Sequence, residues 1–349
     1  ESSQGILPVA LPFPVIYEDA DILVVNKPAG MSSHDVVNRC RSIFGERRVG
    51  HTGTLDPMAT GVLPICVGPA TRLGAYLTGH DKRYRVSIAF GAGTDTDDAA
   101  GTVVRTGEVP DRVLDPEFAA AFVASLVGRR KQMPPAYSAI KVNGKKSYEA
   151  ARAGNIIDLA PRDIEVYSAE LLGIGGADGA EPARWDIAFK VSKGTYIRAL
   201  ARDIGHSLGC PAHVGALRRT AAGAIGIADC VTLEVLEEMG ERAALDPLKV
   251  LGMRFIYLDD AAAARVRNGN PLDGRAVELF ERRSVDPAAE LCACTAGVRP
   301  SCEAPHDGEV VALVADNRIV ALYEYHVDKG RFAPRCVFPI GVSRGCSDL

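Results

Sequence analysis

Long apolar segments are missing from this chain of 349 residues. No stretch approaches the roughly 20 apolar residues that a membrane-spanning helix requires. Residues 1–14 also lack a basic start followed by an apolar run, so the sequence predicts no secretory signal. The hydrophobic content of 47% and the charged content of 24% are typical of a soluble globular protein. We therefore expect a cytoplasmic protein with no membrane contact.

Clusters of metal ligands are almost as scarce. The chain has nine cysteines, and most of them stand alone in apolar surroundings, which favours reduced, buried thiols. Only Cys292, Cys294 and Cys302 lie close together. A zinc site normally has four ligands at tight spacings, so we favour a variable loop over a zinc site there and expect no bound metal.

An excess of positive charge is also absent overall, because the formal net charge is −4. The distribution is uneven, however: residues 27–85 contain nine lysines and arginines against four acidic residues, and a second basic run begins at residue 129. Local positive potential, not the total charge, attracts phosphates, so these runs are candidate nucleic-acid contacts. For each run alone, the alternative is solvated surface charge.

The length exceeds what one hydrophobic core comfortably holds and predicts a large domain followed by a smaller one. Apolar periodicity predicts strands at 21–26, 61–67, 82–90, 164–174, 185–191 and 214–220, and helices at 36–44, 70–77, 116–127, 196–208 and 233–239. We expect Thr195 to cap the helix at 196–208. A helix at 259–268 and a hairpin of 310–314 with 319–325 follow. We place the domains at 1–252 and 253–349, with an unassigned insert at 278–307.

The most informative segment is Gly50-His51-Thr52-Gly53-Thr54-Leu55-Asp56-Pro57-Met58-Ala59-Thr60-Gly61-Val62-Leu63. It combines three glycines with one carboxylate and one imidazole. Glycines let a backbone approach a ligand closely. The proline after Asp56 disfavours helical backbone at that aspartate, which could present its carboxylate to a cleft. An isolated Asp-Pro would ordinarily be a turn.

The whole segment resembles, without a gap, the motif G-H-x-G-T-L-D-P-x-A-x-G-x-L of the TruB family of tRNA pseudouridine synthases. The resemblance implies that Asp56 is the catalytic nucleophile and that His51 contacts the substrate. Taken alone, His51 would be an ordinary surface or capped histidine.

Five further segments resemble that family's motifs in the same order: Lys27-Pro28-Ala29-Gly30, Asp81-Lys82-Arg83-Tyr84, residues 132–141, Lys193-Gly194-Thr195-Tyr196-Ile197-Arg198 and Gly215-Ala216-Leu217-Arg218-Arg219-Thr220. They imply that Tyr84 stacks on the target base and takes part in catalysis. Tyr196 would line the uracil pocket, Arg198 would pair with the nucleophile, and Leu217 would touch the base. We also count Lys27 among the substrate-binding residues. Alone, these side chains would be core residues or exposed helix charges.

The resemblance implies an α+β catalytic domain with a mixed, largely antiparallel sheet flanked by helices. Residues 132–160 would clasp RNA, and a small β-rich domain of PUA type would follow. The implied activity is isomerisation of the uridine at position 55 in the T-loop of tRNA, with the base flipped out of the stack. The reaction involves no redox change, so we expect no cofactor. We also expect a monomer that acts on tRNA without a guide RNA.

Two segments depart from this pattern. Residues 15–28 resemble the start of the RluA-type synthases, but Thr54 stands where that sister family has an arginine, so the catalytic motif decides for TruB. The insert at 278–307 has no counterpart. Three rivals stay open: the guide-RNA-dependent branch of the superfamily, a non-catalytic RNA-binding or RNA-folding protein, and a small-molecule hydrolase that uses Asp56 and His51.

Overall fold

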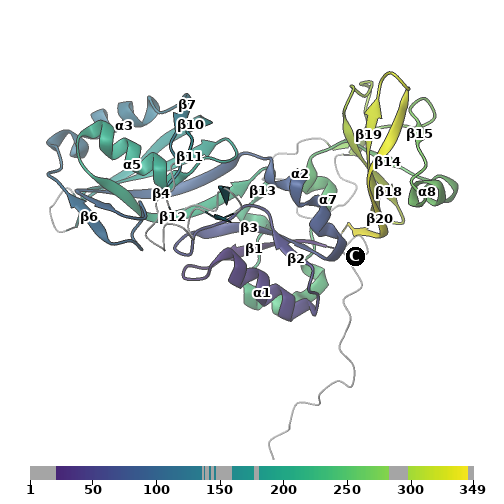
Figure 1. Cartoon of the computed structure of the whole chain (residues 1–349), viewed down its shortest axis with the longest axis horizontal. Helices are drawn as coiled ribbons and strands as arrows, with labels where there is room; N and C mark the ends of the chain where they lie inside the picture. The colour runs from purple at the N-terminus through teal and green to yellow at the C-terminus, as the bar shows by residue number, and fades with distance from the viewer. Residues whose placement is uncertain are drawn as a thin grey trace, which may run out of the picture.

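The chain folds around two β-sheets, which Figure 1 shows at opposite ends of the molecule. The computed structural model describes residues 21–135, 137, 141–142, 145–146, 159–176, 181–282 and 298–344. The larger sheet has the order β1 (Ile22–Lys27), β3 (Thr60–Val67), β12 (Ala212–Ala222), β4 (Lys82–Phe90), β11 (Arg184–Val191), β10 (Arg162–Gly175) and β7 (Gly128–Gln132), with β2 (Val49–His51) beside β3 and β13 (Ile225–Gly226) beside β12.

The smaller sheet has the order β15 (Leu272–Asp273), β20 (Arg331–Ser343), β19 (Arg318–His326), β18 (Val310–Ala315), β14 (Phe255–Tyr257), β16 (Phe280–Arg282) and β17 (Val298–Pro300). Two short ribbons pair β5 (Ala92–Thr94) with β6 (Val103–Thr106), and β8 (Lys141–Val142) with β9 (Lys145–Lys146). Each large sheet contains one parallel pair, β3–β12 and β14–β18.

The helices are α1 (Ser33–Phe44), α2 (Gly74–Thr78), α3 (Pro116–Ala124), α5 (Ile197–Leu208), α6 (Leu233–Met239), α7 (Pro247–Leu251) and α8 (Asp260–Arg267). Short 3-10 turns occupy Gly68–Leu73, Asp111–Leu114, Ile227–Asp229 and Gly240–Ala243. None of the helices in the described ranges has the length and apolarity that crossing a bilayer requires. The mixed, largely antiparallel sheets with flanking helices confirm the expected α+β class.

Most predicted elements are present, and two local expectations were wrong. Thr195 does not cap α5: the N-cap is Tyr196, no side chain caps the helix, and the Thr195 hydroxyl lies 3.3 Å from Ser192 Oγ. Periodicity predicted no strand between the helix at 36–44 and the strand at 61–67, yet β2 lies there and pairs with β3. Most of residues 132–160, together with Cys292 and Cys294, lies outside the described residues, while Cys302 is exposed.

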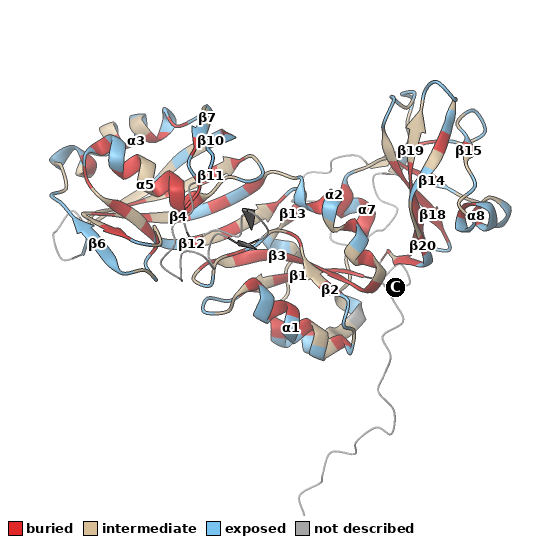
Figure 2. Ribbon diagram, in the orientation of Figure 1, coloured by how far each residue is buried: buried red, intermediate tan, exposed pale blue. Residues whose placement is uncertain are grey.

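The larger sheet has two unlike faces, as the alternation along β4 shows. Tyr84 and Val86 are buried, whereas Arg83 and Arg85, which alternate with them, are exposed. The buried face packs against α5 through the stripe Ile197, Leu200, Ala201 and Ile204, as the 3.6-residue period predicts. We call these the inner and outer faces of the sheet (Figure 2).

A glycine is required where β3 pairs with β12. Gly61 has φ 101° and pairs with Arg219, and a Cβ there would lie 2.1 Å from the Arg219 carbonyl oxygen. Gly61→Ala should therefore lower the free energy of unfolding through both backbone strain and this clash. Gly209, with φ 78° and no atom within 4 Å of its Cβ position, is the matched control.

Chemical denaturation should show a loss of about 1–2 kcal/mol for Gly209→Ala and at least about twice that for Gly61→Ala. Equal losses for the two variants would mean that the close approach of β3 to β12 is not a constraint.

Candidate active site

The loop between β2 and β3 places Asp56 near the inner face of the sheet. The residue before it is fixed from the first turn of α1, because Ser33 Oγ accepts a 2.8 Å hydrogen bond from Leu55 N and donates a 3.0 Å bond to Leu55 O. Ser33 is buried, so this reciprocal contact is shielded from water. A tight turn follows, in which Ala59 N donates to Asp56 O at 3.0 Å. The aspartate therefore projects from a fixed backbone.

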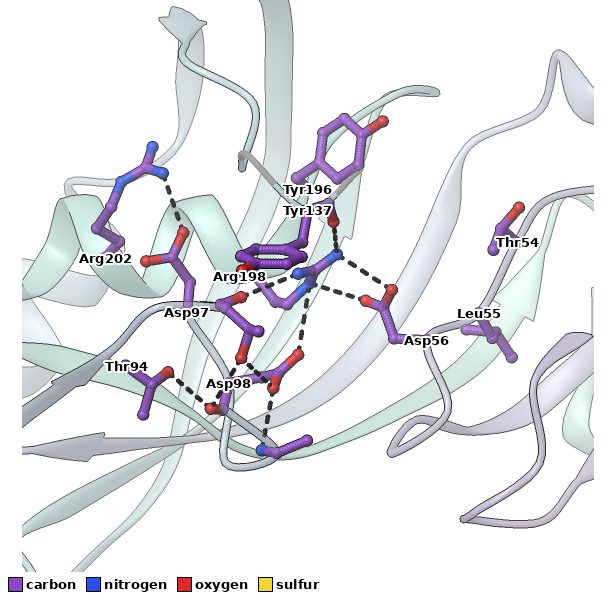
Figure 3. A network of polar contacts seen from close by, with 12 residues as sticks. Thr54, Leu55, Asp56, Thr94, Asp97, Asp98, Tyr137, Tyr196, Arg198 and Arg202 are labelled. Atoms are coloured by element: carbon purple, nitrogen blue, oxygen red, sulfur yellow. Dashed lines mark hydrogen bonds and ion pairs between the residues drawn. The ribbon is translucent and has the colours of Figure 1, made fainter. Parts of the chain in front are cut away.

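Asp56 is paired with Arg198, which comes from the first turn of α5 (Figure 3). Arg198 Nε lies 2.9 Å from one carboxylate oxygen and a terminal nitrogen lies 3.1 Å from the other. The Arg198 side chain is 6% exposed and that of Asp56 is 33% exposed. The guanidinium is thus enclosed by protein, while the carboxylate stays open to an incoming molecule.

Protein groups surround the remaining edge of the guanidinium. Arg198 donates to the carbonyls of Thr96 at 2.9 Å and Tyr137 at 2.8 Å, and its Nε lies 3.8 Å from the buried carboxylate of Asp98. Asp98 is itself held by the Thr96 hydroxyl at 2.7 Å. Residues 94–101 are rich in Asp and Gly, which is typical of a turn, but the sequence does not show that this segment faces α5.

These charges act on Asp56 in opposite directions. Burial raises the pKa of Asp56 above its usual value, the Arg198 guanidinium works against that rise, and the neighbouring Asp98 carboxylate adds to it. The result is a desolvated carboxylate whose ionised form depends on its partner. Such a group can act as a nucleophile or can stabilise positive charge that develops on a sugar.

Two buried cations hold the loop through its main chain. Lys27 is fully buried, and its ammonium donates to the carbonyls of Pro57 at 3.1 Å and Ala59 at 2.6 Å, and to Pro28 at 2.8 Å. Arg219, 1% exposed, donates to the carbonyl of Gly53 at 3.0 Å. The geometry therefore gives Lys27 a supporting role in place of the predicted contact with substrate, because protein carbonyls occupy its ammonium.

Burial lowers the pKa of Lys27 from 10.5 to about 8, which makes its contribution testable. Above pH 8 the folded chain begins to lose this proton, while the unfolded chain keeps it to about 10.5. The free energy of unfolding therefore gains from this group as pH rises through that window. Lys27→Met should be less stable than wild type at pH 7, because it leaves buried carbonyls unpaired. Denaturation curves should show that the difference in free energy of unfolding between wild type and Lys27→Met widens between pH 8 and 10.5. A difference that stays constant with pH would contradict this assignment.

Gln132 holds the main chain of Tyr196, the N-cap residue of α5. Its side-chain amide donates to Tyr196 O at 3.0 Å and accepts from Tyr196 N at 2.9 Å, and Gln132 is 1% exposed. Tyr196 thereby receives a fixed backbone two residues before Arg198. The sequence motif contained Gln132, but we had given it no role, because its partner is a main-chain amide 64 residues away.

The other predicted site residues lie on the inner face or at its edge. In register, Tyr84 is opposite Arg219, and Leu217 is opposite Val86, so Tyr84 and Leu217 share a face. Both are mostly buried in the core, so each has a packing role. His51 is half-buried, and burial lowers its pKa below 6.5; its Nδ1 has no hydrogen-bond partner among the described residues.

Potential metal ligands gather elsewhere. Within the described residues, Asp307, His326 and Asp328 bring ligand atoms within 4.8 Å of one another, at the smaller sheet. His326 and Asp328 belong to the end of β19 and the turn after it, far along the chain from Asp56. Around Asp56 the charged neighbours include the Asp98 carboxylate and the Arg198 guanidinium, and a guanidinium has no lone pair with which to bind a metal.

Family models match most of the larger sheet. The model described as "TruB family pseudouridylate synthase (N terminal domain)" matches residues 41–197, and "tRNA pseudouridylate synthase B C-terminal domain" matches residues 198–253. The fold is also similar to a chain in "Structure of H/ACA RNP bound to a substrate RNA containing 2'-deoxyuridine", with a TM-score of 0.60 at 22% identity, covering 91% of this chain and 84% of that one.

Curated relatives agree. The chain is 43% identical over 254 residues to "tRNA pseudouridine synthase B" of Geobacillus thermodenitrificans, covering 71% of this chain and 84% of the relative. It is 41% identical over 311 residues to the protein of the same name in Mycobacteroides abscessus, covering 89% and 93%. The fold is that of a pseudouridine synthase. Among these enzymes, the chain belongs to the TruB family.

Proposed function

We propose that this chain converts the uridine at position 55 in the T-loop of tRNA to pseudouridine, with Asp56 as its catalytic carboxylate. The observation that carries the proposal is the pair of Asp56 with Arg198, in which the guanidinium is buried and the carboxylate is one-third exposed. Membership of the TruB family and the names of the relatives support tRNA as the substrate.

The reaction breaks the bond between C1′ and N1, turns the uracil and joins its C5 to C1′. An ionised Asp56 can add to C1′ of the sugar or to C6 of the uracil, and either step needs the charge that Arg198 maintains. No electrons are exchanged, so the chemistry requires no redox cofactor. The target nucleotide lies inside a folded RNA loop and must leave the stack to reach the carboxylate.

Tyr84, Tyr196 and Leu217 are proposed to hold the extruded base. Stacking on an aromatic ring is the usual way that proteins hold an unstacked RNA base, and Leu217 offers apolar contact on the same sheet face as Tyr84. His51, whose Nδ1 has no partner in the described part of the chain, is proposed to contact the RNA. Lys27 and Arg219 hold the loop beneath the carboxylate.

The Tyr84 hydroxyl is proposed to assist removal of the proton from C5. Tyr84→Phe keeps the ring and removes the hydroxyl, so kcat should fall by about 10²-fold while binding of tRNA stays unchanged. Single-turnover rates with excess enzyme measure the chemical step directly. An unchanged rate would assign Tyr84 to stacking alone.

Incubating the purified protein with an unmodified tRNA transcript and then mapping pseudouridine tests the proposed function. We expect modification at position 55 and none in a transcript that carries cytidine there. Modification only after addition of a guide RNA and partner proteins would favour the guide-dependent rival. Binding without any modification would favour the non-catalytic rival. A monomeric, cytoplasmic enzyme that works without a guide remains our prediction.

A further inference from the structure

The outer face of the larger sheet carries basic side chains that the proposed reaction does not use. Arg83 and Arg85 on β4 are exposed, and their cross-strand partners are Lys190 on β11 and Arg218 on β12. Both cross-strand pairs therefore place like charges directly opposite each other. We call these four residues the basic sheet face.

Like charges opposite each other across a β-ladder are destabilising, so this arrangement costs folding free energy. Within the described residues, no ion pair joins these four cations to a carboxylate: Asp186 lies 3.7 Å from Arg184, and Glu165 is paired with Arg129. The nearby Asp81 side chain is hydrogen-bonded to Tyr167. Glu170 is opposite Ala188, one strand away from Arg85. The four cations are consequently available to an external polyanion.

An aromatic ring adjoins one of these cations, Lys190. Tyr167 is exposed, and its ring lies 5.4 Å from Lys190 Nζ. It is the extra residue where the register of β10 shifts against β11, between Val166 and Ser168. Phosphate-binding cations beside an exposed aromatic ring are a combination that suits RNA better than an acidic protein surface.

The basic sheet face points away from the catalytic residues, so a nucleotide bound at Asp56 does not lie against it. Along β4, Tyr84 and Val86 point to the inner face with α5 and Arg198, whereas Arg83 and Arg85 point the other way. We propose that the basic sheet face binds backbone phosphates of tRNA that lie outside the T-arm hairpin. This inference rests on the proposed function, because it takes tRNA as the bound molecule.

The test compares the double variant R83Q/R85Q with wild type on whole tRNA and on the isolated T-arm hairpin. For whole tRNA, the slope of log affinity against log salt concentration should fall by about 2, and affinity should fall by about tenfold at moderate salt. For the hairpin, affinity, slope and rate of pseudouridine formation should equal those of wild type. Thermal stability should be equal or higher, because the repulsion across the strands is removed.

The double variant R39Q/R184Q is the matched control. It removes the same charge from two surface arginines that already have carboxylate partners, Glu237 and Asp186. Its salt slope should match that of wild type. Provided that wild type modifies tRNA, an unchanged salt slope in R83Q/R85Q would overturn the inference. So would an equal fall in affinity for whole tRNA and for the hairpin. Failure of wild type to modify tRNA would instead overturn the proposed function.

Discussion

Replacing Asp56 with asparagine should remove pseudouridine formation and leave tRNA binding within about threefold of wild type. Asparagine has nearly the same shape and can still accept one hydrogen bond from Arg198, so the loop should keep its position. It is a far weaker nucleophile and carries no charge to balance a cationic sugar, so the rate should fall at least about 10⁴-fold. Single-turnover assays and filter binding with the same tRNA measure the two effects separately.

Asp246→Asn is the matched control for this variant. Asp246, the N-cap of α7, has a side chain that is 9% exposed and is held by two arginines, at 2.5 Å from Arg282 and 3.0 Å from Arg344. Its replacement should lower thermal stability but leave the rate unchanged at temperatures below melting. If the activity of Asp56→Asn falls only as far as its loss of stability explains, the carboxylate has a structural role.

Arg198→Met should give the second largest loss, with a change in pH dependence that structural damage alone would not produce. Asp56 acts ionised, and burial already raises its pKa. Arg198 is the main group opposing that rise, so its removal should raise the pKa further. Activity falls as pH drops through this pKa, and the acidic limb of kcat/KM should therefore move to higher pH.

The loss of rate at neutral pH should be about 10²- to 10³-fold, because the carboxylate also loses its fixed orientation. Arg198→Lys should recover the position of the acidic limb better than the rate, since lysine restores charge but not the two-point contact. Arg202→Met, one turn further along α5 and paired with Asp97, should leave the limb in place. An acidic limb at the wild-type pH in Arg198→Met would remove Arg198 from the control of Asp56.

The sequence predicted the fold and the central pair well, for physical reasons that differ. The strand β4 was predictable because its alternation follows directly from burial of one face. The pairing of Asp56 with Arg198 was not visible in periodicity, because 142 residues separate them; only the resemblance to a family joined them. Their proposed roles in catalysis stay predictions.

Buried cations were the main omission. Sequence patterns assign lysine and arginine to the surface, yet Lys27 and Arg219 are almost fully enclosed. Arg219 could have been found, because it lies two residues after Leu217 on one strand and so faces the same side. Lys27 could not, since its partners are carbonyl groups, which every residue has. The N-cap of α5 was predicted wrongly for a similar reason, because Gln132, from a distant strand, accepts a hydrogen bond from the main-chain amide of Tyr196.

The support that Lys27 and Arg219 give the catalytic loop reaches its carbonyl oxygens, at Gly53, Thr54, Pro57 and Ala59. Any residue supplies a carbonyl, so this support does not depend on the side chain at an exposed position such as 54. The loop can therefore accept new side chains that alter which nucleotide is chosen while its carboxylate stays in place. In this architecture, specificity and chemistry can evolve separately.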